Sequence, residues 1–133
     1  MSRVLIDTNA FSALIAGDDR VADELAKNES ILLSPIVVGE LLEGFQLGSH
    51  AAENRKILER FREKPRTVCV PITDATAEWF AEIKRMLRKK GKPIPSNDAW
   101  IAASCMEHGC RLLSLDAHFS EIDGLLRIGI AGN

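Results

Sequence analysis

The sequence predicts an α/β fold, a three-layer α/β/α sandwich with a mostly parallel central sheet of about five strands. The first observation is a set of short apolar runs with the length expected of buried strands. The second is that helical patterns separate these runs, which favours parallel pairing through right-handed crossovers. The third is that no internal repeat, linker or low-complexity tract interrupts the 133 residues. We therefore expect one domain spanning residues 1–133, because this length supplies one hydrophobic core and not two.

The expected strands begin with an apolar run that breaks at Asp7 into small polar residues. Pro71 closes the third run, and Asp116 directly follows the fourth. Cys69 lies in the third run and Cys105 in a helical pattern, so we expect both thiols to be buried. The expected strands are residues 4–6, 31–33, 67–70, 112–115 and, as a short last strand, 127–130.

The expected helices follow from apolar spacing and from the residues at their ends. Ser34 and Pro35 are a typical cap and first-turn proline, and Gly109 is a typical helix stop. The longest helix has a predicted buried stripe of Trp79, Phe80, Ile83 and Leu87. The expected helices are residues 11–15, 18–25, 35–47, 50–64, 74–90 and 96–108.

Composition narrows the class of protein. Hydrophobic residues make up 46% and charged residues 27%, a balance typical of a folded globular protein. The formal net charge of −2 counts mildly against a nucleic-acid binder. No apolar stretch approaches the roughly 18 residues of a membrane helix, and Asp7 interrupts the apolar segment near the N-terminus. We therefore expect a cytoplasmic protein without a membrane span.

Acidic residues recur where the predicted strands end. Asp7 and Asp116 each follow an apolar run, and the carboxyl ends of parallel strands meet at one edge of a sheet. Asp98 lies in the first turn of a helix that precedes a parallel strand, so it begins at the same edge. Glu40 lies on the second turn of its helix, at the flank of the apolar stripe. We therefore expect these acids to converge on one crevice.

The chemistry that matches such a cluster is metal-assisted phosphodiester hydrolysis. Like charges at close range raise one another's pKa unless a cation is present, and Mg²⁺ is a hard cation that accepts carboxylate ligands. A bound ion can activate water and stabilise the leaving oxygen. For the Asp-Thr-Asn segment at residues 7–9, simple capping of the following helix is about as good an explanation. The three histidines are not spaced as zinc ligands, and neither a P-loop nor a Gly-x-Ser-x-Gly elbow is present.

Four segments together resemble the PIN-domain family, and within it the VapC-type toxins of toxin–antitoxin pairs. They are Val-Leu-Ile-Asp-Thr-Asn at residues 4–9, Val-Val-Gly-Glu-Leu-Leu at 37–42, Pro-Ser-Asn-Asp-Ala-Trp-Ile-Ala-Ala at 95–103 and Leu-Ser-Leu-Asp-Ala-His-Phe at 113–119. No single segment is specific, whereas the four in this order are, and the likeness covers essentially the whole chain.

The resemblance implies a Mg²⁺- or Mn²⁺-dependent endoribonuclease that cuts structured cellular RNA. It also implies a homodimer neutralised by a cognate VapB-type antitoxin, whose tail fills the acidic groove. The hydroxyl and amide groups of Thr8, Asn9 and Ser114 would orient the carboxylates or contact the scissile phosphate. Whether one or two ions bind, and whether the last acid binds metal directly or through water, stays open. The metal ligands and catalytic residues would be Asp7, Glu40, Asp98 and Asp116.

Other readings stay open at this level. A PIN-fold module could hold RNA or a protein without cutting, and the same crevice chemistry would suit a phosphatase or a DNA nuclease. Basic residues at 84–92 slightly favour an RNA contact, whereas those at 55–66 fit a solvated helix face better. Trp100 could stack on a base or fill a dimer interface, with core packing at least as good an explanation. His118 could be a general acid, although shaping a turn explains it better.

Overall fold

The computed structural model describes residues 2–130, in which five strands form one sheet with parallel pairing throughout. The predicted fold class is therefore confirmed. Strand β1 lies in the centre, the chain first extends the sheet on one side of it, and it then returns to extend the other side. The order is β3-β2-β1-β4-β5, with β1 at Arg3–Ile6, β2 at Ser30–Leu33, β3 at Thr67–Cys69, β4 at Arg111–Ser114 and β5 at Arg127–Gly129.

This order creates a switch point between β1 and β4. In open parallel sheets, the crevice outside the carboxyl ends of the strands at such a point is where ligands bind. Asp7 directly follows β1, and Asp116 lies two residues after the end of β4. The topology therefore places Asp7 on one side of the crevice and Asp116 on the other.

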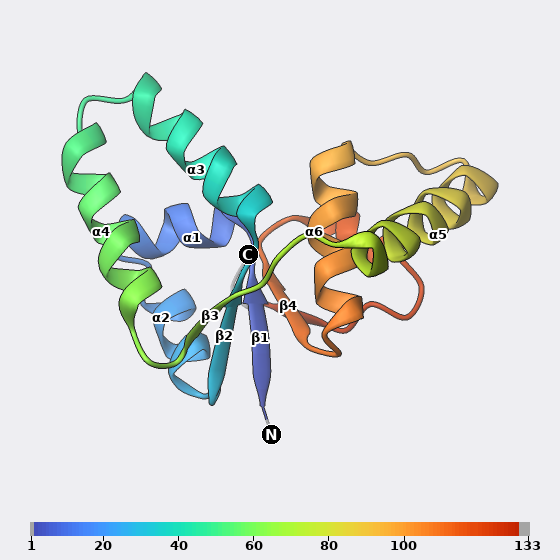
Figure 1. The fold of residues 1–133 in the computed structure, drawn as a ribbon, viewed down its shortest axis with the longest axis horizontal. Helices are drawn as coiled ribbons and strands as arrows, with labels where there is room; N and C mark the ends of the chain where they lie inside the picture. Colours follow the sequence, from blue (N-terminus) through green and yellow to red (C-terminus); the bar gives the residue numbers. More distant parts are fainter. Residues whose placement is uncertain (1, 131–133) are drawn as a thin grey trace.

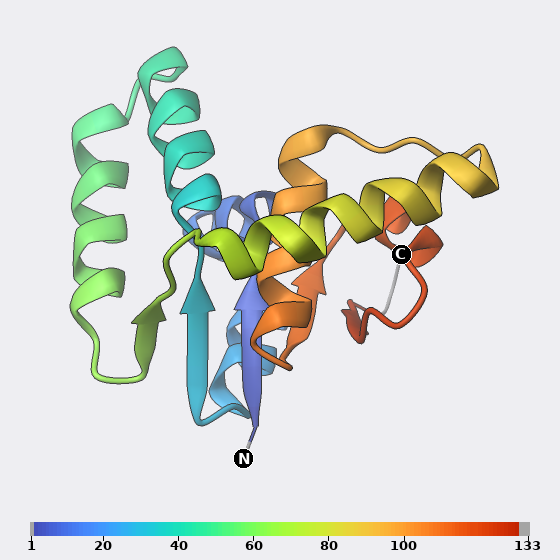
Figure 2. The same cartoon turned by 45° about the vertical axis from the view of Figure 1, so that its right-hand side comes forward.

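Helices cover both faces of the sheet. Figure 1 shows α1 to α4 on one side of the strands and α5 with α6 on the other. In Figure 2, α5 and α6 pass in front of the sheet while α1 and α2 lie behind it. Helices α3 and α4 pack against each other as a hairpin. The helices are α1 (Thr8–Ile15), α2 (Asp19–Ala26), α3 (Pro35–Leu47), α4 (Ala51–Glu63), α5 (Asp74–Lys90) and α6 (Ser96–Glu107), with a short 3-10 helix η1 (Ala117–Glu121).

Helices α3 and α5 begin and end where the sequence signals predict. The Ser34 side chain accepts a hydrogen bond of 3.1 Å from the Ile36 amide, and Pro35 occupies the first turn of α3. Gly91 ends α5 with φ +66°, a left-handed conformation that a residue with a side chain rarely adopts. Gly91 therefore fixes the point at which the chain leaves α5 for the loop to α6.

The core lies between the sheet and its helices. The side chains of Val4, Leu5 and Ile6 are fully buried, as expected for a central strand covered on both faces. Phe11 packs edge-on against Phe61 with ring centroids 4.8 Å apart. No helix in the described part of the chain is long and apolar enough to cross a membrane.

Two predictions of burial are wrong. Trp79 is 39% exposed, because Thr76, Ile83 and Leu87 occupy the buried line of α5 and the indole falls at its margin. Cys69 is exposed because it ends β3, an edge strand. By contrast, the predicted burial of Cys105 is confirmed.

Smaller differences concern the ends of elements. Helix α1 begins at Thr8, three residues earlier than predicted, because Asp7 itself caps it. Strand β4 ends at Ser114, and Asp116 then caps η1, which was not predicted. The fully buried Phe119 lies in η1 and packs into the core.

Candidate active site

The four predicted acids line one pocket at the carboxyl edge of the sheet, with a volume of about 310 Å³. The four acids lie on four separate segments: the loop after β1, helix α3, the start of α6 and the loop after β4. Strand polarity explains the convergence, because α1, α3 and η1 begin where a parallel strand has just ended and α6 begins at that same edge. The lining consists of Asp7, Thr8, Asn9, Glu40, Pro95, Asp98, Asp116 and His118.

Asp7 is the most buried of these acids, with 2% of its surface exposed. Its Oδ1 accepts a hydrogen bond of 2.8 Å from the Ala10 amide, and its Oδ2 accepts one of 2.5 Å from the Ser114 hydroxyl. Asp7 therefore caps α1 and lines the pocket at once, so the two explanations of the Asp-Thr-Asn segment are compatible.

The pKa of Asp7 is raised to about 6, against an ordinary value of 3.8. Burial is the largest cause, because it disfavours the charged form. The bonds from Ser114 and Ala10 lower the pKa in part, whereas the charges of Asp116 and Asp98 raise it further. The carboxylates thus lie close enough to repel one another.

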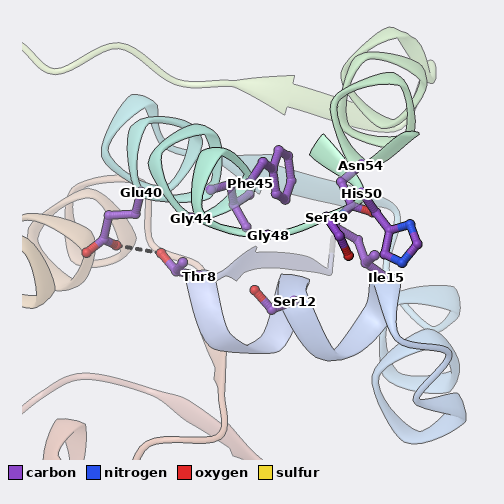
Figure 3. Close-up of a pocket in the computed structure, with 11 residues that line it drawn as sticks. Thr8, Ser12, Ile15, Glu40, Gly44, Phe45, Gly48, Ser49, His50 and Asn54 are labelled. Carbon is purple, nitrogen blue, oxygen red and sulfur yellow. Dashed lines mark hydrogen bonds between the residues drawn. The ribbon is translucent and has the colours of Figure 1, made fainter. Parts of the chain in front are cut away.

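Glu40 is held by two donors from other elements. The Thr8 hydroxyl donates a hydrogen bond of 2.5 Å to its Oε1, the contact drawn in Figure 3. The Asn97 amide nitrogen donates to its Oε2 at 3.2 Å. These bonds connect α3 to the first turns of α1 and α6, and they fix the direction of a carboxylate that is only half-buried.

Asp116 is oriented by the two predicted polar neighbours. The Asn9 side-chain nitrogen donates a hydrogen bond of 2.8 Å to its Oδ2. The backbone amide of Asp116 donates to the Ser114 hydroxyl oxygen at 2.9 Å. Because that hydroxyl also donates to Asp7, one side chain links two of the acids.

Asp98 makes a contact that the sequence did not single out. Its Oδ2 lies 2.7 Å from His118 Nε2, and His118 lies in the pocket as well as in the turn after β4. Burial raises the pKa of Asp98, the His118 contact opposes this, and the charges of Glu40 and Asp116 raise it further. His118 was a candidate in the sequence, whereas Asn97 was missed, although its place beside Asp98 at a helix start was the available signal.

The donor set suits a hard divalent cation, since it consists of mutually repelling carboxylates around an open pocket. Among residues 2–130, no three acidic, histidine or cysteine side chains are close enough to hold an ion directly. Mg²⁺ commonly binds one or two carboxylates and keeps several waters, so direct contact with all four acids is not required. The residues fit an ion bound partly through water.

Several residues that the sequence suggests as RNA contacts are engaged by other side chains of the fold. Lys90 pairs with Asp123 at 2.6 Å and Arg85 with Glu82 at 2.5 Å, which neutralises part of the basic end of α5. Trp100 stacks on Phe80 with ring centroids 4.0 Å apart. Core-type packing therefore accounts for part of the Trp100 surface, and an RNA contact at 84–92 stays a prediction.

Comparison with known proteins gives a consistent picture. The PIN-domain family model matches residues 4–125. Ribonuclease VapC5 of Mycobacterium tuberculosis is 23% identical over 126 residues, covering 95% of this chain and 92% of that protein. Ribonuclease VapC4 of the same organism is 27% identical over 118 residues, 89% of each chain. A similar fold occurs in the crystal structure of VapBC2 from Rickettsia felis bound to a DNA fragment from the VapBC2 promoter. The TM-score is 0.84 at 24% sequence identity, and the match covers 96% of this chain and 98% of that one.

Proposed function

Because the chain belongs to the PIN-domain family, we propose that it is a metal-dependent endoribonuclease and the toxin of a VapBC-type toxin–antitoxin pair. One observation carries the proposal: Asp7, Glu40, Asp98 and Asp116 come from four distant segments and line a single pocket. Packing alone gives no reason for four carboxylates to meet there, since each raises the cost of ionising the others. The likeness to two ribonucleases of the VapC type supports the choice of RNA as substrate.

The reaction is hydrolysis of a phosphodiester bond. The water oxygen forms a new bond to phosphorus, in line with the bond from phosphorus to the 3′ oxygen, which breaks. The 3′ oxygen takes up a proton that the water gives up, so the products are a 3′-hydroxyl and a 5′-phosphate. A Mg²⁺ or Mn²⁺ ion held by the four acids would lower the pKa of water and offset phosphate charge. The chain's own polar groups keep the carboxylates in place: Ser114 holds Asp7, Thr8 and Asn97 hold Glu40, and Asn9 holds Asp116.

Partners follow from the same pocket. A cognate VapB-type antitoxin would block it by bringing a cationic side chain, such as arginine, to the carboxylates. We further propose that the toxin acts as a homodimer and that residues 1–133 form a single PIN domain. Structured cellular RNA is the substrate class that we favour. Aromatic side chains make up only 5% of the residues, so few are available to stack on successive bases of single-stranded RNA.

A second candidate is a PIN-fold module that binds RNA or a protein without cutting. The observation in its favour is that no three potential ligands converge tightly within residues 2–130. This module would bind its partner equally well with an acid replaced by its amide, whereas the nuclease would lose turnover.

The test is to incubate purified protein with total cellular RNA and Mg²⁺ or Mn²⁺, with chelator as the control, and to map the new ends. The nuclease predicts discrete fragments with 5′-phosphates that form only with metal. Unchanged RNA, together with retained RNA binding in a filter assay, would favour the non-cutting module.

A further inference from the structure

A second pocket continues from the acidic one, between α1, α3 and the start of α4. Its volume is about 450 Å³. Thr8 and Glu40 line both pockets, so the two share a boundary. Figure 3 shows Thr8 and Glu40 at one end and His50 with Asn54 at the other. A molecule bound at the carboxylates can therefore extend directly into this space.

Helix periodicity explains the continuity. Thr8 and Ser12 are four residues apart on α1, and Glu40 and Gly44 are four apart on α3, so each pair lies on one helix face. The second residue of each pair lines the second pocket about 6 Å further along its helix, at a rise of about 1.5 Å per residue. That step is of the size of a ribose, the group that separates a phosphate from its base.

The lining combines an apolar wall with hydrogen-bonding groups. Ile15 and the half-buried Phe45 supply apolar surface. Ser12, Ser49 and Asn54 also line the pocket, and their side chains make no hydrogen bond within residues 2–130. In structured RNA, the bases of loops and bulges are unstacked, and RNA-binding proteins recognise such bases with this combination of an apolar or aromatic surface and polar groups at the base edge.

Glycine keeps the space open. A Cβ added at Gly44 would meet no atom within 4 Å, and Gly44 lies in the interior of α3 with ordinary helical geometry. A glycine inside a helix costs stability relative to alanine. A larger side chain at this position would therefore fit the helix and project into the pocket.

We propose that this second pocket is a nucleobase-binding subsite, which takes the base next to the phosphate held at the carboxylates. This inference rests on the proposed ribonuclease function, and it names the part of the substrate that the site selects. The occupant is a nucleobase because the pocket shares Thr8 and Glu40 with the acidic site and offers uncommitted hydrogen-bonding groups beside an apolar wall.

The test uses Gly44→Leu, which fills the pocket, and Asn54→Ala, which removes a polar group from its far end. Gly39→Leu is the matched control, since Gly39 lies on the same helix, has open space at its Cβ and does not line either pocket. Wild type and variants cut an RNA pool of randomised sequence, and the fragment ends are sequenced. We expect a base preference at a fixed position beside the cut, reduced about fivefold by Asn54→Ala, the effect of one typical hydrogen bond. Gly44→Leu should remove the preference, and Gly39→Leu should keep it.

A second measurement does not depend on cleavage. In chelator, adenosine, cytidine, guanosine and uridine are titrated into labelled protein, and amide signals are followed by NMR. These nucleosides are uncharged, so the carboxylates do not repel them. At least one should shift the signals of Gly44, Gly48 and Asn54 in wild type and in Gly39→Leu, but not in Gly44→Leu.

The outcomes separate the two proposals. Cleavage with a preference that the pocket variants leave unchanged would overturn the subsite and leave the nuclease standing; the pocket would then suit a protein segment better. Absence of cleavage by wild type would contradict the nuclease, and the nucleoside titration would then decide by itself whether the pocket binds a base. Absence of any nucleoside-induced shift at the pocket would contradict the subsite, whatever the cleavage assay shows.

Discussion

The Ser114 hydroxyl donates a hydrogen bond of 2.5 Å to Asp7 Oδ2, although the two residues are 107 positions apart in the sequence. The bond joins the end of β4 to the loop after β1 across the switch point of the sheet. It stabilises the ionised carboxylate of Asp7 and so lowers its pKa, against the larger effect of burial. Ser114 therefore increases the fraction of Asp7 that is charged near neutral pH.

Replacing Ser114 by alanine should shift the pH dependence of cleavage. Without the donated bond, the pKa of Asp7 rises above about 6, and less of the carboxylate is ionised at neutral pH. The acid limb of the pH–rate profile should move to higher pH, with a rate loss near pH 7 of roughly tenfold. Ser104→Ala is the matched control, since Ser104 is a buried serine whose hydroxyl has no partner among the described residues. Superimposable profiles for Ser114→Ala and wild type would contradict the role of this bond.

Replacing Asp7 by asparagine should stabilise the metal-free protein. The unfolded chain ionises Asp7 near pH 3.8 and the folded protein near 6, so stability falls as the pH rises through this window. The asparagine oxygen can still accept from Ala10, and its nitrogen can donate to the Ser114 oxygen. The free energy of unfolding at about pH 7.5 should rise by up to about 3 kcal/mol.

Urea unfolding in chelator measures this difference. The gain should shrink toward pH 4, where Asp7 is largely protonated in the folded wild type. An asparagine variant that is less stable than wild type at neutral pH would show that burial of the charge is not the dominant effect.

Thr8 offers a test of how Glu40 is held. Thr8→Val keeps the shape of the side chain but removes the hydroxyl that donates to Glu40 Oε1. Loss of such an orienting contact lowers metal affinity or activity by roughly tenfold or more. Thr8→Ser retains the hydroxyl and should stay close to wild type in cleavage rate. Equal rates for the valine and serine variants would mean that the hydrogen bond has no role in activity.

Binding of a divalent ion should raise thermal stability. An ion that binds only the folded protein stabilises it by mass action, by about 2.7 kcal/mol at a hundred times its dissociation constant. Mn²⁺ should therefore raise the unfolding temperature of wild type by several degrees, and Asp98→Asn should lose most of this shift. Asp74→Asn, an exposed acid in the first turn of α5, should keep it. A shift of equal size in all three proteins would place the ion elsewhere.

The sequence was sufficient to predict the parallel sheet and the edge where the acids meet. Central strands such as residues 4–6 are apolar throughout because both faces are covered, and their polarity fixes where Asp7 and Asp116 emerge. The same logic placed Asp98, since a helix leading into a parallel strand begins at the carboxyl edge.

Tertiary contacts were less predictable. The approach of His118 to Asp98 depends on how the 3-10 turn after β4 packs against α6, which no local pattern encodes. The exposure of Trp79 and Cys69 likewise depends on what covers a helix margin and an edge strand. Apolar spacing identifies a stripe, but it does not say how far the neighbouring element extends over it.

Cleavage of total cellular RNA by wild type and by Asp7→Asn, each with Mn²⁺ and with chelator, tests the central claim most directly. Asp74→Asn serves as the matched control for loss of one acid. The proposed nuclease predicts discrete fragments from wild type and Asp74→Asn with metal, and none from Asp7→Asn or from any sample in chelator. Equal cleavage by wild type and Asp7→Asn would contradict the claim that the carboxylate pocket is the site of the reaction.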